Sequence, residues 1–548
     1  MAPFPPSPAP RFSVEVYQNE YLPVGGREVN AIITVTSAGG GTAGEPGAVG
    51  VPGAAAGLGT AEGPGAAEGP GAAAGLGPMG GPGAAAGPGA SGGSGAVEGP
   101  GAAGGTPIPG PPIPGPPIPG PPIPGPPIPG PPIPGPALAP GPRQDVPGES
   151  GRCGASSGAA VVIMVDCSGS MGYPPTKMRH ARDATAAAID TVRDGVAFAV
   201  VAGTHKAVEV FPGGGRLATA DPLTRARAKE ALCGLSPGGG TAIGSWLLLA
   251  DQLLGSADAA IRHGILLTDG RNEHEEPERL RAVLDACAGR FTCDARGVGT
   301  DWEVEEVTGI ASALLGTADI VADPAGLRAD FTRMTKAAMG KETADVSLRL
   351  WTPKGAEVVY VKQVAPAVED LTARRVEAGP RAGDYPTGSW GEESRDYHVC
   401  VRVPAAETGR EMLAARISLV QPPPGGAGSP PSPLAQGLVR AVWTDDLAAS
   451  TAMNPQVAHY TGQAELAQAI QAGMNARKSG NAKQATAKLG RAVQLATASG
   501  NEDTAKLLAK VVDVVDAAAG TVRLKAKVTE ADEMTLETRS TKTVRVKK

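Results

Sequence analysis

The stretch VIMVDCSGSMG at residues 162–172 decides the fold of this chain. An uninterrupted apolar run ends in Asp166, and Ser168 and Ser170 follow at alternate positions before a helical segment begins. Ligands bind beyond the carboxyl ends of the strands in an open parallel sheet. The three side chains are therefore expected to converge at one sheet edge. Carboxylate and hydroxyl groups are hard oxygen ligands that suit Mg²⁺ or Mn²⁺.

Two later loops carry oxygen ligands of the same kind. The sequence GGGTAIGSW, residues 238–246, places Thr241 at a glycine-rich turn directly before a helical segment. The sequence LLTDGRNE, residues 266–273, ends a second apolar run with Asp269. If the apolar runs are neighbouring parallel strands, both loops lie at the same sheet edge as Asp166. The predicted metal ligands are Asp166, Ser168, Ser170, Thr241 and Asp269.

Residues 159–340 alternate short apolar runs with amphipathic helical segments. Continuous apolar runs are typical of strands buried on both faces, and their alternation with helices is typical of a parallel sheet covered on both sides. The predicted fold class of this region is therefore α/β, with a doubly wound, mostly parallel sheet. The expected strands are 159–166, 197–203, 207–211, 264–269, 291–299 and 318–323, and the expected helices are 176–194, 222–234, 241–255, 277–290, 302–315 and 325–339.

This region resembles the von Willebrand factor type A domain. The pattern DCSGS at 166–170, followed by Thr241 and by TDG at 268–270, matches all five positions of that family's metal-ion-dependent adhesion site. The resemblance covers about 159–340. It implies that both Ser hydroxyls bind the metal directly, that Thr241 binds directly or through water, and that the carboxylates often act through water. It also implies an open coordination position for a Glu or Asp of a partner.

The predicted function is metal-dependent capture of an acidic residue on a protein partner. A divalent ion with few nearby carboxylates keeps positive charge and attracts an incoming carboxylate. The expected cofactor is Mg²⁺ or Mn²⁺, and the expected setting is bacterial intracellular signalling or complex assembly. The high Ala, Gly, Pro and Arg content is typical of a high-GC bacterium such as an actinomycete.

A serine hydrolase is a remote alternative. The segment SGSMG at 168–172 approaches the nucleophile elbow G-x-S-x-G, but Ser168 stands where the elbow needs Gly. His274 lies in the charged stretch RNEHEEPE, where an imidazole is usually a solvated loop residue. The loop GGGTAIG also lacks the Lys of a phosphate-binding P-loop. The sequence predicts no catalytic residue and a protein that is not an enzyme.

Bulk composition excludes other classes. The chain has 548 residues with 78 Gly, 54 Pro and 3% aromatic residues, so part of it is low-complexity sequence. A formal net charge of -6 gives no support to a nucleic-acid surface. The sequence has no apolar run of about 18 residues and no basic-then-apolar start, so we expect no membrane contact, no secretory signal and a cytoplasmic location.

The remaining sequence divides by composition. A Gly/Ala/Pro-rich, disordered linker is predicted, with PPIPG repeated five times at 111–135. These repeats are interpreted as a spacer, with docking to a proline-reading domain as the alternative. Period-two alternation predicts N-terminal strands that join a later antiparallel β-sandwich. The predicted domains are 1–37 (β strands), 38–158 (linker), 159–340 (type A domain), 341–446 (β-sandwich), 447–520 (three helices of about 16–18 residues) and 521–548 (Thr-rich basic tail, a strand or a flexible arm).

The main alternative function is a scaffold with a structural metal. In that case the β-sandwich, the helical segment or the tail binds the partner. The stretch TLETRSTKT, 535–543, is a candidate phosphate acceptor flanked by Arg539 and Lys542. The layout also resembles bacterial type A proteins associated with serine/threonine kinase and forkhead-associated signalling, which implies partners of those classes.

Overall fold

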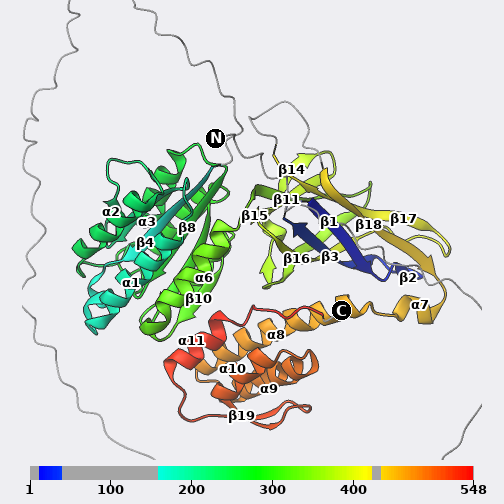
Figure 1. Ribbon diagram of the computed structural model, residues 1–548. Helices are drawn as coiled ribbons and strands as arrows, with labels where there is room; N and C mark the ends of the chain where they lie inside the picture. The colour runs from blue at the N-terminus through cyan, green and yellow to red at the C-terminus, as the bar shows by residue number, and fades with distance from the viewer. Residues whose placement is uncertain (1–10, 40–157, 423–432, 547–548) are drawn as a thin grey trace, which may run out of the picture. The chain divides into compact units, whose positions relative to one another are not determined.

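A computed structural model describes residues 11–39, 158–422 and 433–546. The PPIPG repeats and nearly all of the predicted linker lie outside these described residues. The described residues include an α/β domain, two mostly antiparallel sheets that share one core, and a C-terminal group of helices (Figure 1).

The α/β domain is built on one sheet with the strand order β10-β9-β8-β4-β5-β6, and β7 also pairs with β5. β4, β5, β8, β9 and β10 are parallel to their neighbours in this group, whereas β6 and β7 run antiparallel to β5. The doubly wound, mostly parallel sheet is thus confirmed. Its strands are β4 (Ala159–Asp166), β5 (Ala197–Gly203), β6 (Ala207–Phe211), β7 (Ala218–Thr219), β8 (Ile261–Thr268), β9 (Thr292–Val298) and β10 (Ala318–Val321).

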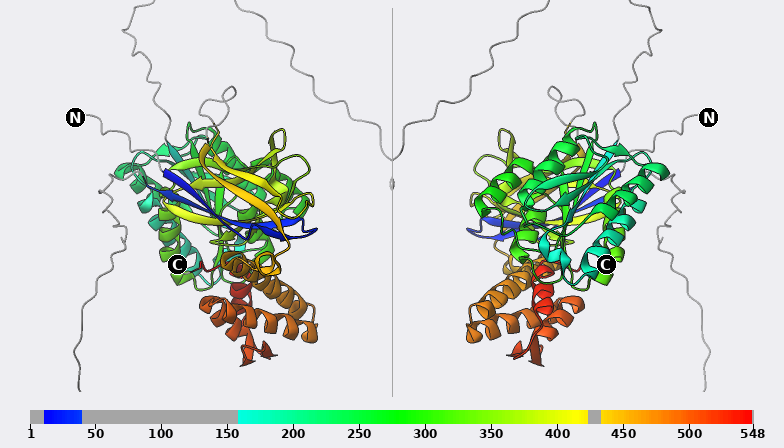
Figure 2. Two further views of the ribbon diagram at one scale, coloured as in Figure 1. Left: turned by 90° about the vertical axis from the view of Figure 1, so that its right-hand side faces the viewer. Right: turned by 90° about the vertical axis from the view of Figure 1, so that its left-hand side faces the viewer.

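Helices cover both faces of this sheet (Figures 1 and 2), because the central strands are apolar on both sides. In β4, Val162 and Met164 point into one core, and Val161, Ile163 and Val165 point into the other. The first core packs against α3, α4 and α5, and the second against α1 and α6. The helices are α1 (Thr176–Thr191), α2 (Pro222–Ala231), α3 (Ile243–Gly255), α4 (Pro277–Cys287), α5 (Val304–Ala313) and α6 (Leu327–Met339), with short 3-10 turns η1 (Gly169–Gly172), η2 (Leu232–Gly234) and η3 (Pro324–Gly326).

Gly297 of β9 makes room for the indole of Trp302. A Cβ at Gly297 would lie 2.0 Å from Cε2 of Trp302, whose side chain is almost fully buried. We expect Gly297→Ala to lower the free energy of unfolding by about 3 kcal/mol, because the ring has no free space to enter. Gly309→Ala in α5 is the matched control, because a Cβ there meets no atom within 4 Å. Urea unfolding should show the control unchanged or stabilised by up to about 1 kcal/mol, and equal stability of the two variants would contradict this packing.

Within residues 11–38, two of the three strands pair with strands that lie more than 300 positions later. β3 lies between β1 and β16 in the sheet β1-β3-β16-β12-β13, and β2 forms an edge of the sheet β14-β15-β11-β17-β18-β2. Both sheets contribute to one apolar core (Figure 2). The strands are β1 (Arg11–Gln18), β2 (Tyr21–Pro23), β3 (Glu28–Ala38), β11 (Thr343–Trp351), β12 (Glu357–Ala365), β13 (Glu369–Asp370), β14 (Val376–Gly379), β15 (Ala382–Trp390), β16 (Glu393–Arg402), β17 (Glu411–Val420) and β18 (Pro433–Thr444), with a 3-10 turn η4 (Thr372–Arg374).

A buried histidine in β16 makes the stability of this part depend on pH. Nε2 of His398 lies 3.0 Å from Oδ1 of Asn30 and 3.1 Å from the Tyr360 hydroxyl. Burial, with a smaller contribution from Lys362, lowers the pKa of His398 to about 4. Because the unfolded chain takes up this proton at a higher pH, the stability from neutral His398 is complete above about pH 6.5 and is lost as the pH falls towards 4.

When the pH falls from 7.5 to 5, we therefore expect the free energy of unfolding of His398→Gln to decrease by about 2 kcal/mol less than that of the wild type. The neutral amide does not titrate and keeps a donor for Asn30. Urea unfolding at the two pH values measures the difference, with the exposed His205→Gln as control. Parallel losses in all three proteins would show that His398 is not the titrating group.

The C-terminal region contains helices of unequal length and a β-hairpin. Asn481 and Asn501, from the two SGN sequences, each accept a backbone N–H at the start of the next helix. The three expected helices correspond to α8, α9 and α10, but their lengths differ. α10 is the shortest of the three, because the chain turns into a strand at Val512. The elements are α7 (Leu447–Thr451), α8 (Pro455–Lys478), α9 (Ala482–Ala498), α10 (Glu502–Val511), β19 (Val512–Asp516), β20 (Thr521–Leu524) and α11 (Glu530–Thr538).

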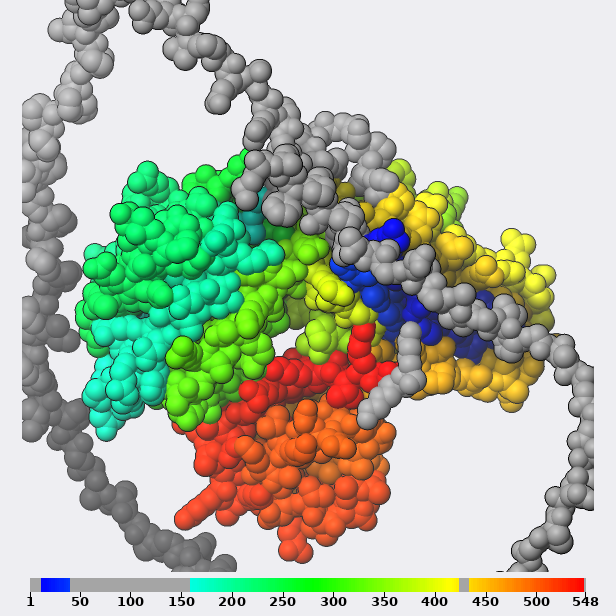
Figure 3. All heavy atoms as spheres, viewed as in Figure 1, coloured from blue at the N-terminus to red at the C-terminus, as the bar shows by residue number. Residues whose placement is uncertain are grey.

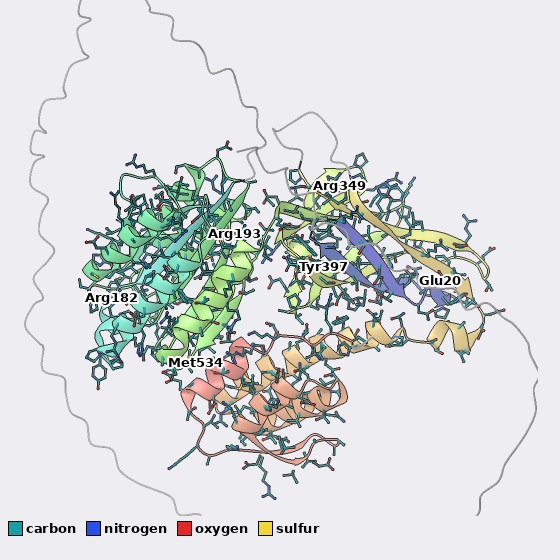
Figure 4. The ribbon with its side chains drawn as sticks, in the orientation of Figure 1. Glu20, Arg182, Arg193, Arg349, Tyr397 and Met534 are labelled. Atoms are coloured by element: carbon teal, nitrogen blue, oxygen red, sulfur yellow. The ribbon has the colours of Figure 1, made fainter. Side chains whose placement is uncertain are left out.

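The Thr-rich tail is packed against the rest of the chain. Thr529 caps α11, and Met534, labelled in Figure 4, joins the apolar core that α5 and β9 form. Arg539 and Lys542 both pair with Asp319 of β10, at 2.8 and 2.6 Å. Figure 3 shows the red C-terminal residues against the green part of the α/β domain. The segment predicted as a strand or a flexible arm thus contains both the strand β20 and the helix α11.

The prediction of no membrane span can be compared with the described helices. Among residues 11–39, 158–422 and 433–546, no helix combines the length and the apolar character that a membrane span needs.

Candidate metal centre

The five predicted ligands lie together at the carboxyl end of the α/β sheet. Asp166 ends β4, and Asp269 follows β8, which is the parallel neighbour of β4 (Figure 1). Ser168 and Ser170 lie at η1, directly after β4. Thr241 lies two residues before α3. Adjacent parallel strands therefore bring these loops together, as the sequence predicts.

Asp166 is a fully buried anchor of the site. Its Oδ1 accepts a hydrogen bond from the backbone N–H of Ser168 at 2.8 Å. Its Oδ2 accepts from the Thr268 hydroxyl at 2.8 Å and from the backbone N–H of Asp269 at 3.3 Å. These bonds hold the carboxylate in one orientation and tie the loops after β4 and β8 to each other.

Three hydroxyl groups converge beside Gly270. The Oγ atoms of Ser168 and Ser170 are 2.8 Å apart, and the Ser170 hydroxyl donates to Oδ1 of Asp269 at 2.8 Å. A Cβ at Gly270 would lie 3.0 Å from Oγ of Ser170, 3.3 Å from Oγ1 of Thr241 and 3.7 Å from Oγ of Ser168. Glycine at this position keeps open the space that the hydroxyls border.

The loop that carries Thr241 is held by His274. The backbone N–H of Thr241 donates to Nδ1 of His274 at 3.3 Å, and the backbone N–H of His274 donates to the Thr241 carbonyl at 3.0 Å. A Cβ at Gly240 would overlap the imidazole, at 2.0 Å from Cε1. The imidazole is exposed, as its charged surroundings predict, but it also positions a predicted ligand.

Asn272 and Glu275 complete this support, and the sequence analysis missed both. Asn272 accepts from the backbone N–H of Ile243 at 2.8 Å, and Glu275 accepts from that of Gly244 at 2.7 Å. These are the first N–H groups of α3, which need acceptors from outside the helix. The signal that could have found them is the absence of a capping side chain in the local sequence GGGTAIG.

Lys177 is a further unpredicted member of the site. It lies in the first turn of α1 and is only 4% exposed. Its ammonium group is 2.6 Å from Oδ2 of Asp269, 3.4 Å from the Ser170 carbonyl and 3.5 Å from Oδ2 of Asp301. The centre thus contains a fixed positive charge next to one of the predicted carboxylates.

Burial dominates the electrostatics of the two carboxylates. Burial, with repulsion from Asp269, raises the pKa of Asp166 to about 6 despite hydrogen bonds from Ser168 and Thr268. Burial also raises the pKa of Asp269, while Lys177 and Ser170 act in the opposite direction. Two buried carboxylates that disfavour their ionised forms are suited to a bound cation, which would relieve that penalty.

The donor set fits a small divalent ion that prefers oxygen. Two carboxylates and three hydroxyls border one space, and none of these groups is a soft sulfur or nitrogen ligand. Within the described ranges, no group of three or more His, Cys, Asp or Glu side chains is placed to hold a metal ion. The candidate centre therefore depends on its hydroxyls as much as on its carboxylates.

The hydrogen bonds of the two serine hydroxyls do not favour the hydrolase alternative. The Ser168 hydroxyl pairs with that of Ser170, which in turn donates to Asp269. Nδ1 of His274 accepts the backbone N–H of Thr241. The serines are thus arranged around a carboxylate, and Nδ1 of His274 is occupied by a backbone donor instead of a serine hydroxyl, as a serine–histidine pair would require.

Comparison with known proteins assigns the family. The model of the von Willebrand factor type A domain matches residues 159–320, and that of the von Willebrand factor type A C-terminal domain matches residues 494–540. A von Willebrand factor type A protein from Catenulispora acidiphila is 41% identical in sequence, and the match covers 99% of each chain with a TM-score of 0.74. The chain belongs to the von Willebrand factor type A family, and its fold class of α/β sheet, β-sandwich and C-terminal helices is confirmed.

Two further matches are partial. An uncharacterized protein from Synechocystis sp. is 27% identical over 217 residues, which are 39% of this chain and 50% of that protein. The chain thus spans about half the length of this curated relative. Proximal thread matrix protein 1 from the mussel byssus, in a structure described as having a zinc-occupied MIDAS motif, is 26% identical, with coverage of 34% and 46% of the two chains and a TM-score of 0.28.

Proposed function

We propose that this protein is a metal-dependent protein-binding module and not an enzyme. In this proposal Asp166, Ser168, Ser170, Thr241 and Asp269 hold Mg²⁺ or Mn²⁺, and a protein partner supplies a Glu or Asp side chain to the ion. The observation that carries the proposal is the convergence of three hydroxyl oxygens within 4 Å of one point beside Gly270, next to two buried carboxylates.

The hydrogen bonds explain how the hydroxyls can serve as ligands. The Ser170 hydroxyl directs its proton to Asp269, which leaves oxygen lone pairs free to face a cation. Asp166 has its oxygens occupied by the donors of Ser168 and Thr268, so its role is to orient the loop and to add negative charge. When bound, the divalent ion would supply a positive centre for an incoming carboxylate.

The partner in this proposal is defined by chemistry alone. A site that combines neutral hydroxyls with few carboxylates favours a ligand with its own negative charge. Partners among kinase and forkhead-associated signalling proteins stay a prediction. Phosphorylation of the tail also stays a prediction, and the structure restricts where it can occur, because Thr535, Thr538 and Ser540 are buried.

The test uses the full-length chain and Mn²⁺, whose effect on water proton relaxation reports the water molecules it keeps. We expect Mn²⁺ to bind the wild type and a glutamate-containing peptide with blocked termini, acetyl-Gly-Gly-Glu-Gly-Gly-amide, to reduce the relaxation by replacing metal-bound water. The peptide with Gln in place of Glu should have no effect, because a neutral amide competes poorly with water for a hard cation.

Two serine variants make the test specific. Ser170→Ala should lose the Mn²⁺ signal, and Ser256→Ala, at the far end of α3, should keep it. If the folded wild type binds no Mn²⁺, the metal-dependent mechanism is wrong. If Mn²⁺ binds but the glutamate peptide changes nothing, the scaffold function with a structural metal is favoured. Deletion of residues 447–548 would remove the helical segment and the tail that the scaffold function requires. It is a poorer test, because it also removes Met534 from the core of the α/β domain.

A further inference from the structure

Lys177 is placed where a cation affects the metal centre directly. Lysine side chains are almost never fully buried unless they are paired, and this one is 4% exposed. Its Nζ donates to Oδ2 of Asp269 at 2.6 Å, on the oxygen that the Ser170 hydroxyl leaves free. The Ser170 carbonyl and Asp301 complete its surroundings at 3.4 and 3.5 Å. Lys177 thus contacts two residues of the predicted ligand set.

The charges in the centre follow from this placement. The buried side chains of Asp166 and Asp269 contribute two negative charges, and the Lys177 ammonium offsets one of them. The Asp301 carboxylate lies 3.5 Å from Lys177 but is 68% exposed, so solvent and salt screen its charge. A bound dication would therefore leave the centre with net positive charge, which one carboxylate from a partner would balance. Without Lys177, the two aspartates alone would neutralise the dication. Charge balance in a buried site has large energetic consequences, because the local dielectric constant is low.

We propose that Lys177 is a resident counter-cation that couples metal binding to capture of an acidic ligand. This inference rests on the proposed function and adds a regulatory property to the same site. Lys177 weakens metal binding to the free protein and makes a carboxylate ligand necessary to complete the charge balance. Because coupling between two ligands is reciprocal, an acidic ligand strengthens metal binding by the factor by which metal strengthens acid binding. The metal and the partner then bind together rather than in succession.

A purely structural role for Lys177 predicts the opposite effect. Lys177 links the loop after β8 to Asp301, which precedes α5, and could serve only to fix Asp269 in place. Loss of such a support would weaken metal binding. Under the counter-cation proposal, removal of the charge strengthens metal binding. The direction of the change in Mn²⁺ affinity therefore separates the two roles.

The experiment is calorimetric titration of Mn²⁺ into the full-length wild type and into Lys177→Met, each in chloride and in acetate buffer at equal ionic strength. We expect acetate to raise the Mn²⁺ affinity of the wild type roughly tenfold. Lys177→Met should bind Mn²⁺ roughly tenfold more tightly than the wild type in chloride, and acetate should change its affinity by less than about threefold. Lys177→Arg keeps the charge and should keep the effect of acetate.

Lys336→Met removes an exposed lysine on α6 and is the control for a change in overall charge, so it should titrate like the wild type. Weaker Mn²⁺ binding by Lys177→Met, or an unchanged effect of acetate in that variant, overturns the counter-cation proposal while the proposed function stands. Absence of Mn²⁺ binding in both proteins overturns the proposed function and this inference with it. Binding by Lys177→Met in both buffers and by the wild type only in acetate supports the inference and shows that the wild-type site requires the acidic ligand.

Discussion

Asp166→Asn is expected to abolish divalent-metal binding and to leave the metal-free protein at least as stable as the wild type. The substitution removes one of the two negative charges of the centre. Asn can accept the Ser168 N–H in the same way, and the Thr268 hydroxyl can then donate to the Gly270 carbonyl, which is 3.1 Å away. The donors of Ser168 and Thr268 therefore keep acceptors, and only the backbone N–H of Asp269 loses its bond to this side chain.

The stability half of this prediction follows from the sign of the pKa shift. Burial beside Asp269 raises the pKa of Asp166 to about 6, so the folded state loses stability as the pH rises from about 4 through 6. The ionised, metal-free wild type carries a penalty on the order of 3 kcal/mol at neutral pH. Asp166→Asn has no such charge to bury, which offsets the loss of the hydrogen bond from the Asp269 N–H.

Calorimetric titration and thermal melts in Mn²⁺ and in EDTA test both halves. The wild type should show saturable binding and a melting temperature that rises with Mn²⁺, whereas Asp166→Asn should show neither. Asp285→Asn, on the exposed side of α4, is the matched control and should behave as the wild type does. Saturable Mn²⁺ binding by Asp166→Asn at wild-type affinity would show that Asp166 does not contribute to the metal site.

Asp294→Ala is expected to lower the free energy of unfolding by about 4 kcal/mol, with no direct effect on the metal centre. Asp294 of β9 is buried and accepts three hydrogen bonds, from the backbone N–H and hydroxyl of Thr317 and from Nε2 of His263. The substitution leaves those donors without an acceptor and removes one carboxylate near Arg296, which still pairs with Asp330 at 2.8 Å. An unpaired group in a buried network costs its full desolvation energy.

The pH dependence gives this prediction a second readout. Pairing with His263, Arg296 and Thr317 outweighs burial and holds the pKa of Asp294 well below its ordinary value. Its contribution to stability is therefore complete above about pH 4 and is lost as the pH falls further. Urea unfolding at pH 7 should show the loss in Asp294→Ala and almost none in Asp285→Ala. A loss below about 1 kcal/mol would mean that water replaces the carboxylate at this position.

Part of the candidate metal centre was predictable because its residues follow from one local motif and one rule of sheet topology. Asp166, Ser168 and Ser170 are within five positions of each other, and Asp269 ends the neighbouring strand. Lys177 was not predictable in this way. In the sequence it is an ordinary lysine of an amphipathic helix, and its burial depends on how α1 packs beside the loops after β8 and β9.

The fold shows a similar division. Apolar runs such as 159–165 and 264–267 indicate the parallel sheet, since strands buried on both faces have this pattern. The tail gave no comparable signal. The short helix α11 exists because Met534 packs on the α/β core and Leu536 packs among the C-terminal helices. Such tertiary contacts override the weak helical tendency of threonine.

The pairing of β3 with β16 has a consequence for synthesis of the protein. The Thr34 hydroxyl donates to Asp396, 362 residues further along the chain. At about 5–20 residues per second, a ribosome needs on the order of 20–70 s to travel between them. During that interval β3, with its many buried side chains, presents an open edge that can join to another nascent chain. Slow elongation and crowded polysomes should therefore reduce the yield of folded protein, whatever the stability of the finished chain.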